Sequence, residues 1–153
     1  MTITSAICNS FKQELLVEGH NFTNGTDSFK LALFTEDATL NKSTTAYTAP
    51  ADGTADPTNT KEVSSTSTGY TTGGNALTST TPVLSGDTAC CKFADTSFTS
   101  ASFTARGCLI YNSTNSNKAV CAINFGANKT VTSGTFTIQF PAQTAGNAII
   151  QIA

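Results

Sequence analysis

The side chains of this chain that could take part in covalent or acid–base chemistry are few, and their spacing matches no catalytic arrangement. The chain has a single histidine, His20, and five cysteines. A thiol nucleophile needs a neighbouring base, so any Cys–His pair would have to use His20. That residue follows a predicted helix, where a histidine most often acts as a favourable charge at the C-terminus. No spacing singles out a pair among the ten acidic residues. We therefore predict no catalytic residues and expect that the protein is not an enzyme.

Metal and cofactor sites are not predicted either. Cys90 and Cys91 are adjacent rather than separated by two residues, and no second close cysteine pair completes a tetrahedral site. Gly73-Gly74 precedes Asn75 rather than a lysine, which does not fit a phosphate-binding loop. Successive side chains of a strand point to opposite faces. We therefore predict that Cys91 lies inside, beside Phe93, and that Cys90 lies outside.

The cysteines are expected to be buried and reduced. They are Cys8, Cys90, Cys91, Cys108 and Cys121. An odd count without a secretory signal argues against a disulfide framework, and free cysteine is among the most buried residue types. One alternative stays open in the hairpin predicted over 104–125. If Tyr111 faces Lys118 across a turn at 112–117, then Cys108 lies opposite Cys121, close enough for a disulfide.

The only arginine, Arg106, lies in the same predicted hairpin. By alternation it shares a strand face with Cys108 and Ile110, which are apolar neighbours for a guanidinium. We favour a structural ion pair with an acidic residue such as Asp95. The alternatives are a β-bulge at Gly107 and a contact between subunits.

The overall composition limits the classes of partner. Charged residues make up 12% of the chain, against roughly 25% in an average soluble domain. The net charge is −2 and the lysines are spread thinly, so we expect no direct binding to nucleic acid. No apolar run approaches the roughly 20 residues that span a bilayer, and the first residues do not resemble a secretory signal. We therefore expect no membrane partner and synthesis in a cytosol.

Hydrophobic periodicity predicts one helix near the N-terminus. Ser5 is a suitable N-cap, and Ile7, Phe11 and Leu15 recur at four-residue steps. This pattern predicts a helix over about 5–18. So short a helix is marginal in isolation, so its apolar stripe must pack against the rest of the protein or against a neighbouring subunit.

The rest of the chain alternates at period two. Phe29, Leu31 and Leu33 share one strand face, and Phe136 and Ile138 begin another apolar face that continues to position 140. Further strands are predicted at 76–79, 88–94, 102–111, 118–125 and 148–152, with turns at 73–75, 85–87, 112–117 and 133–134. Short strands with frequent turns predict a mainly β fold, an antiparallel β-sandwich or barrel with one short N-terminal α-helix.

The stretch 35–67 differs from the strands. It contains Pro50 and Pro57, is rich in small polar residues, and has almost no large apolar side chains. It predicts a long, exposed excursion with a short strand around 46–49. No repeat or second domain is visible, so residues 1–153 are predicted to form a single β-rich domain.

Several segments of the chain resemble small virion structural proteins of tailed bacteriophages, in particular those of phages that infect cyanobacteria and other aquatic bacteria. The segments are Phe29-Lys30-Leu31-Ala32-Leu33-Phe34, Gly69-Tyr70-Thr71-Thr72-Gly73-Gly74, Phe93-Ala94-Asp95 and Thr104-Ala105-Arg106-Gly107-Cys108-Leu109-Ile110-Tyr111-Asn112. The resemblance covers most of the chain from the predicted helix to Phe140.

The resemblance implies a part of an assembly rather than an enzyme. It implies a capsid cement (decoration) protein that binds the outer capsid surface between capsomers and stabilises the shell. Its partner would be the major capsid protein, in a homo-oligomer or multicopy assembly. The protein would be made in the cytoplasm of the bacterial host and localised to the virion. A tail, fibre or baseplate component that contacts a host receptor is the alternative.

Overall fold

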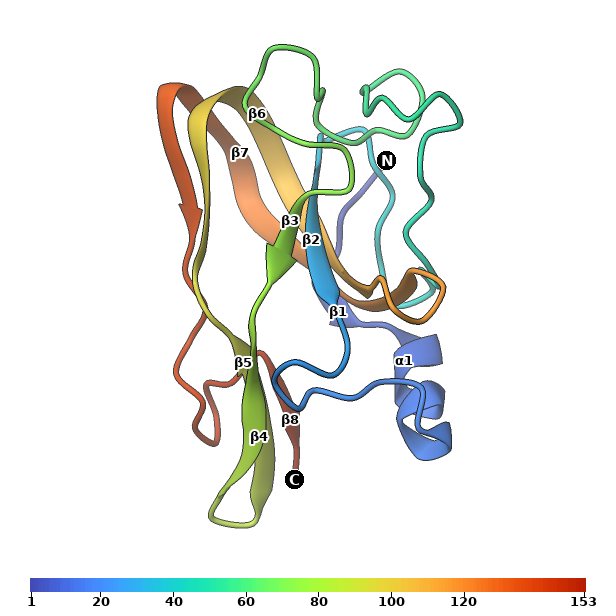
Figure 1. Ribbon diagram of the computed structural model, residues 1–153, viewed down its shortest axis with the longest axis vertical. Helices are drawn as coiled ribbons and strands as arrows, with labels where there is room; N and C mark the ends of the chain where they lie inside the picture. Colours follow the sequence, from blue (N-terminus) through green and yellow to red (C-terminus); the bar gives the residue numbers. More distant parts are fainter.

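The chain folds into two antiparallel β-sheets that share one core, with a short helix near the N-terminus (Figure 1). The computed structural model describes residues 1–153. In chain order the elements are β1 (Ala6–Ile7), α1 (Asn9–Glu14), the 3-10 helix η1 (Leu15–Val17), β2 (Phe29–Phe34), β3 (Asn75–Leu77), β4 (Ser79–Ser85), β5 (Thr88–Phe93), β6 (Thr96–Asn112), β7 (Lys118–Ile138) and β8 (Ile150–Ile152). The prediction of a mainly antiparallel β fold with one short helix is confirmed, and the packing of the two sheets is sandwich-like.

The larger sheet has the strand order β1-β7-β6-β2-β3, and all of these pairings are antiparallel. Strands β6 and β7 form a long hairpin that rises along one side of the molecule (Figure 1). Strand β2 lies between β6 and β3, and five of its six residues are buried. Its near-continuous apolar sequence is therefore that of an interior strand.

The smaller sheet has the order β4-β5-β8 and lies at the lower end of the molecule (Figure 1). Aromatic side chains join it to the larger sheet. The ring of Phe29 on β2 stacks on Phe22 at 4.5 Å and lies 5.5 Å from Phe93 on β5, which in turn lies 5.6 Å from Phe140. Contacts between aromatic rings at these distances add to the burial energy of each ring, so this cluster fixes the position of the lower sheet.

The helix is shorter than predicted. It begins at Asn9 with Cys8 as its N-cap residue, not at Ser5, because Ala6 and Ile7 pair with β7 as strand β1. The residues of the predicted stripe face the core, since Phe11 is buried and Ile7 and Leu15 are partly buried against it. We call α1 and η1 together the helical segment. It ends at Glu18, which adopts the left-handed conformation with φ 57°.

The β6–β7 hairpin contains bulges that the predicted register lacks. The turn at 112–117 is present, but Tyr111 pairs with Ala119 rather than Lys118, and the register shifts again between Ile110 and Tyr111. As a result, Cys108 lies opposite Ile123 and Cys121 lies opposite Ile110. Both cysteines are free, and the proposed disulfide is wrong. Ser133-Gly134 was predicted as a turn, but it lies within β7, where Ser133 takes a positive φ at an irregularity.

The predicted exposed excursion at 35–67 is largely packed against the larger sheet. Its few apolar residues point inward, and Leu40, Tyr47 and Val63 belong to the core. The predicted strand at 46–49 is reduced to a single bridge between Ala46 and Lys118. The prediction of exposure holds for the polar stretches between these anchors, such as 51–54, while the large apolar side chains hold the excursion against the sheet.

Candidate interaction surface

Two clusters of titratable side chains are candidates for chemistry, and the first surrounds Glu62. This carboxylate is fully buried and accepts hydrogen bonds from the Tyr47 hydroxyl at 2.9 Å, the Tyr70 hydroxyl at 2.6 Å and the Gly73 amide at 2.7 Å. Burial raises the pKa of Glu62, although these donors oppose the shift. Glu62 lines none of the four cavities of the molecule, so the cluster holds the excursion in place and is closed to a substrate.

The second cluster surrounds His20, which the sequence singled out. The Nε2 atom lies 2.7 Å from Glu14 Oε2, and Nδ1 lies 3.2 Å from the side-chain nitrogen of Asn112. The Asn112 Oδ1 accepts two backbone N–H groups, from Thr114 and Asn115, so its amide N–H₂ must face the histidine. Nδ1 is therefore the acceptor, and Nε2 carries the hydrogen that it donates to Glu14.

This geometry explains what His20 does. Both ring nitrogens are occupied, so neither is free to take a proton from a cysteine. The Asn112 amide also donates to Asp27 Oδ2 at 2.7 Å. The network thus connects the end of α1, the loop after it and the end of β6, and it fixes the helical segment beside the lower sheet.

The two adjacent cysteines do not have the predicted accessibilities. Cys91 is half-buried, while Cys90 is fully buried. The alternation itself was right, since Cys91 packs against the main core as Phe93 does. The error concerns the other face of β5, which the segment 139–149 covers, with the Gln143 amide donating to the carbonyl of Cys90 at 3.0 Å.

Thiol labelling of the native protein should therefore modify Cys91 first. Burial raises the pKa of the Cys8 thiol to about 11 and that of Cys121 to about 12, and it also raises the pKa values of Cys91 and Cys108. Exposure rather than acidity must then decide the order of reaction. Mass spectrometry after brief treatment with a maleimide should find one label, on Cys91, and a Cys91→Ser variant should stay unlabelled. Equal labelling of Cys90 would contradict the buried position of that residue.

Arg106 forms no ion pair with Asp95 or with another acidic residue, so the favoured prediction is wrong. Its Nε donates to Asn124 Oδ1 at 3.3 Å, while Asp95 accepts the backbone N–H of Phe140 at 2.8 Å. The pairing of β6 and β7 is irregular between Ala105 and Gly107, which pair with Lys129 and Asn124, so the extra residues belong to β7 rather than to a bulge at Gly107. The Arg106 side chain lines a shallow pocket of about 360 Å³ that also contains two carboxylates.

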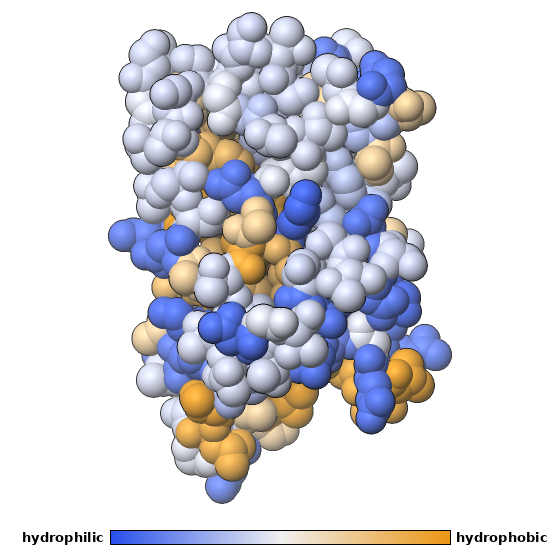
Figure 2. Space-filling view, in the orientation of Figure 1, coloured by the Kyte–Doolittle hydropathy of each residue, from blue (hydrophilic) through white to orange (hydrophobic).

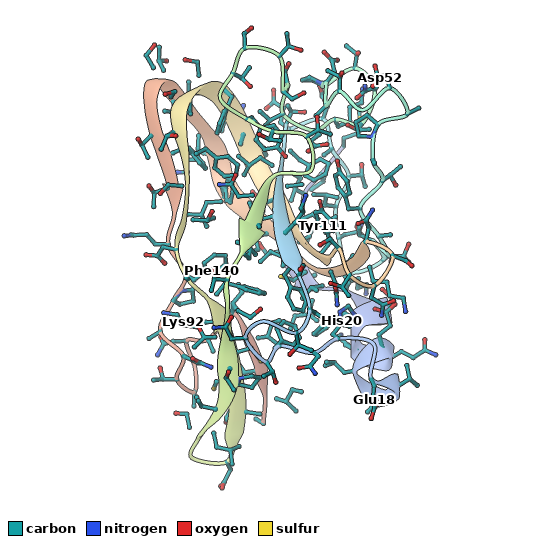
Figure 3. The ribbon with its side chains drawn as sticks, viewed as in Figure 1. Glu18, His20, Asp52, Lys92, Tyr111 and Phe140 are labelled. Carbon is teal, nitrogen blue, oxygen red and sulfur yellow. The ribbon has the colours of Figure 1, made fainter.

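A larger groove of about 730 Å³ opens at the lower end of the molecule, between the helical segment and the β4-β5-β8 sheet. Figure 3 places Glu18 and His20 on the helical side of this region. Its apolar lining comes from both sides and consists of Leu15, Phe22, Pro82, Ala89, Cys91 and Ile152. The groove is therefore assembled from parts of the chain that are far apart in sequence.

Large apolar side chains are exposed on the helical segment and on the sheet that flank this groove. Leu16 is 86% exposed, Leu84 75% and Ile152 57%, and Val17 and Val83 are also exposed. In Figure 2 hydrophobic residues gather on two protrusions at the lower end, one formed by the β4–β5 hairpin and one by the helical segment. Exposed apolar patches of this kind mark interaction sites on soluble proteins.

The apolar residues of the sheet are in register. Leu84 pairs with Ala89, and Ala89 pairs with Ile152, so the three side chains form one row across β4, β5 and β8. Val83 pairs with Cys90 and points to the opposite face. The row thus belongs to the face that lines the groove, and we call Leu84, Ala89 and Ile152 the apolar row.

Neither a metal-binding cluster nor a membrane-spanning helix is found in the molecule. No three His, Cys, Asp or Glu side chains are grouped so as to hold a metal ion, and no helix has the length and apolar character needed to cross a bilayer. Comparisons with protein-family models, with curated proteins and with solved structures find no match to this chain.

Proposed function

We propose that this chain is a structural protein of a tailed bacteriophage virion, a capsid cement protein that binds the outer capsid surface between capsomers. The observation that carries the proposal is the concentration of exposed apolar residues at one end. Six large hydrophobic side chains are exposed, and five of them lie on the helical segment or on the β4-β5-β8 sheet, the sixth being Met1. These five are Leu16, Val17, Val83, Leu84 and Ile152.

Other features support a role in binding rather than in catalysis. The His20 ring has no free nitrogen, and the Glu62 carboxylate is sealed from solvent. The rest of the surface is rich in threonine and poor in charge, which suits a protein that is present in many copies on a crowded particle. The resemblance to phage virion proteins points to the major capsid protein as the partner.

The mechanism of such a protein is mechanical. Each copy would bury its apolar end across the junction of two capsomers, and about 1,600 Å² of buried surface is enough for a stable association. A ligand that binds only the assembled state stabilises it by mass action, by about 2.7 kcal/mol at a hundredfold excess over the dissociation constant. Repetition over the shell multiplies this modest energy, so the particle resists the outward pressure of packaged DNA.

Deleting the gene should give heads that assemble and fill but release their DNA at a lower temperature than wild-type heads. Adding back the wild-type protein should restore the release temperature. A Leu16→Ser/Leu84→Ser double variant should fail to restore it, because two exposed apolar contacts are lost. A Thr132→Asp variant is the matched control, since Thr132 is exposed on β7, away from the apolar end.

The same experiment separates the proposal from its alternative. Deletion heads that are as stable as wild-type heads but adsorb poorly to the host would overturn the cement function and favour a tail, fibre or baseplate component. Restoration by the double variant to the wild-type level would show that the apolar end is not the contact surface.

A further inference from the structure

Strand β8 is a sheet edge that the fold leaves open. It pairs with β5 on one side, and no backbone hydrogen bond reaches it from any other element. The outward N–H and C=O groups of such a strand form a ready template for another strand. The groove lies next to this edge, because Ile152 of β8 is part of its lining.

The other edge of the lower sheet, strand β4, is protected in ways that β8 is not. Strand β4 carries Pro82 and a register shift between Thr80 and Val83. The part of β7 beyond its pairing with β1 carries Lys129, and the pairing of this part with β6 is interrupted by irregularities. Proline, bulges and lysine are the usual means by which proteins block the pairing of an edge strand. Ile150–Ile152 has none of them.

The charges of the groove indicate the sign of its partner. Two carboxylates, Glu18 and Asp27, line it, and no lysine or arginine does. Glu18 is exposed and makes no ion pair. Asp27 uses Oδ2 to accept two hydrogen bonds, while its Oδ1 accepts none from the chain. A second copy docked through the same face would bring these carboxylates together, so like-charge repulsion disfavours it.

We propose that the groove binds an extended, basic segment of a partner protein, which adds to β8 as a fourth strand of the lower sheet. Alternate apolar side chains of this segment pack on the apolar row, and lysine or arginine side chains at its ends reach Glu18 and Asp27. Backbone hydrogen bonds to the β8 edge supply affinity, and the pockets and charges supply specificity. That the segment belongs to a capsid protein rests on the proposed function, whereas the mode of binding rests on the groove itself.

The test uses two short synthetic peptides with blocked ends and a core that alternates valine with threonine, one flanked by lysines at both ends and one flanked by glutamates. The full chain should bind the lysine peptide, and raising the salt from about 0.05 M to about 0.5 M should weaken binding, because the ion pairs are screened. It should not bind the glutamate peptide. Bound lysine peptide should slow the maleimide labelling of Cys91, which lines the groove, and should protect β8 amides from hydrogen exchange.

Single substitutions assign the binding to the groove. Leu84→Asp should weaken binding of the lysine peptide about tenfold or more, because an apolar contact on the apolar row is replaced by a hydrated carboxylate. Val83→Asp is the matched control, since it places the same charge on the same strand but on the opposite face, and it should bind the lysine peptide as wild type does. Glu18→Lys should weaken binding of the lysine peptide and allow binding of the glutamate peptide.

Equal binding of the two peptides, equal effects of Leu84→Asp and Val83→Asp, or unchanged β8 exchange would each overturn the proposal. Failure of the strand mode and failure of the cement function are separate results. Heads that need the protein for stability while the lysine peptide does not bind would leave cement standing and reject strand addition. Binding of the lysine peptide, together with unchanged head stability after deletion of the gene, would reject the cement function and leave strand addition standing.

Discussion

A Gly74→Ala variant is expected to lose more than about 4 kcal/mol of its free energy of unfolding, which is exceptional for a single substitution. Gly74 adopts φ +75° at the point where the excursion returns to the sheet as β3. A Cβ atom added there would overlap the carbonyl oxygen of Leu31 and crowd Ala32, both in the interior strand β2. Because the obstacle is backbone rather than a flexible side chain, it cannot move without disrupting the pairing of β2.

Gly53→Ala and Gly25→Ala are the matched controls for this prediction. Both glycines have positive φ values, of 76° and 83°, but an added Cβ would meet nothing within 4 Å. Each of these variants should lose only about 1–2 kcal/mol of its free energy of unfolding, the cost of a left-handed conformation for a residue with a side chain. Urea unfolding followed by circular dichroism measures all three variants. A loss for Gly74→Ala no larger than that for Gly53→Ala would contradict the close approach of β2 and residue 74.

The strands could be predicted because alternation is a local property. In the predicted face of Phe136, Ile138 and Phe140, all three side chains are at least half-buried, while Thr135 and Thr137 are exposed. Here the solvent side of each strand is polar and the core side apolar, so the period of two is visible in any short window. The same argument gave the correct positions of β5 and of the turn between β4 and β5.

The register of paired strands could not be predicted, nor could the burial of a strand face by another segment, because both depend on contacts between residues that are distant in sequence. The turn pairs Asn112, not Tyr111, with Lys118, and the register shifts again between Ile110 and Tyr111. These two changes together moved Cys108 away from Cys121. Likewise, nothing near Cys90 indicates that segment 139–149 returns to cover it. Local pattern identifies a strand and its faces, but not which face another segment will bury.

The candidate interaction surface was missed for the same reason, although part of its signal was in the sequence. Leu16 and Val17 continue the helix beyond its inward stripe, and Val83 and Leu84 are consecutive apolar residues beside a turn. On a half-buried element, adjacent apolar residues place at least one of them in solvent. The sequence does not reveal that these pairs lie on either side of one groove, since 65 residues or more separate them along the chain.

Replacing Glu62 with alanine should lower the free energy of unfolding by about 3–5 kcal/mol. The substitution leaves three buried donors without an acceptor, namely two tyrosine hydroxyls and the Gly73 amide, and each unsatisfied buried group costs about 1–3 kcal/mol. It also frees the excursion from the sheet, since Tyr47 stacks on Tyr111 of β6 and Tyr111 in turn donates to the Gly73 carbonyl at 2.8 Å. Urea unfolding at neutral pH measures this loss.

A Glu62→Gln variant tests the charge of this site rather than its shape. Burial raises the pKa of Glu62 in the folded protein above the ordinary value of 4.5. As the pH rises past 4.5, the unfolded chain releases this proton before the folded protein does, so the unfolded state binds fewer protons. The free energy of unfolding of the wild type should therefore fall between pH 4.5 and the raised pKa, and glutamine, which stays neutral, should remove this part of the slope.

The difference between the free energies of unfolding of the two proteins isolates the contribution of Glu62 from those of the other carboxylates. Asp56, for example, has a lowered pKa because Thr58 donates to it, and it contributes stability that is lost on acidification. That contribution is common to wild type and Glu62→Gln, and it cancels in the difference. The stability of wild type relative to Glu62→Gln should be greatest at acid pH, where both side chains are neutral, and should decrease as the pH rises. A difference that grows with pH would mean that the three donors and the nearby Lys30 favour the ionised carboxylate more strongly than burial disfavours it.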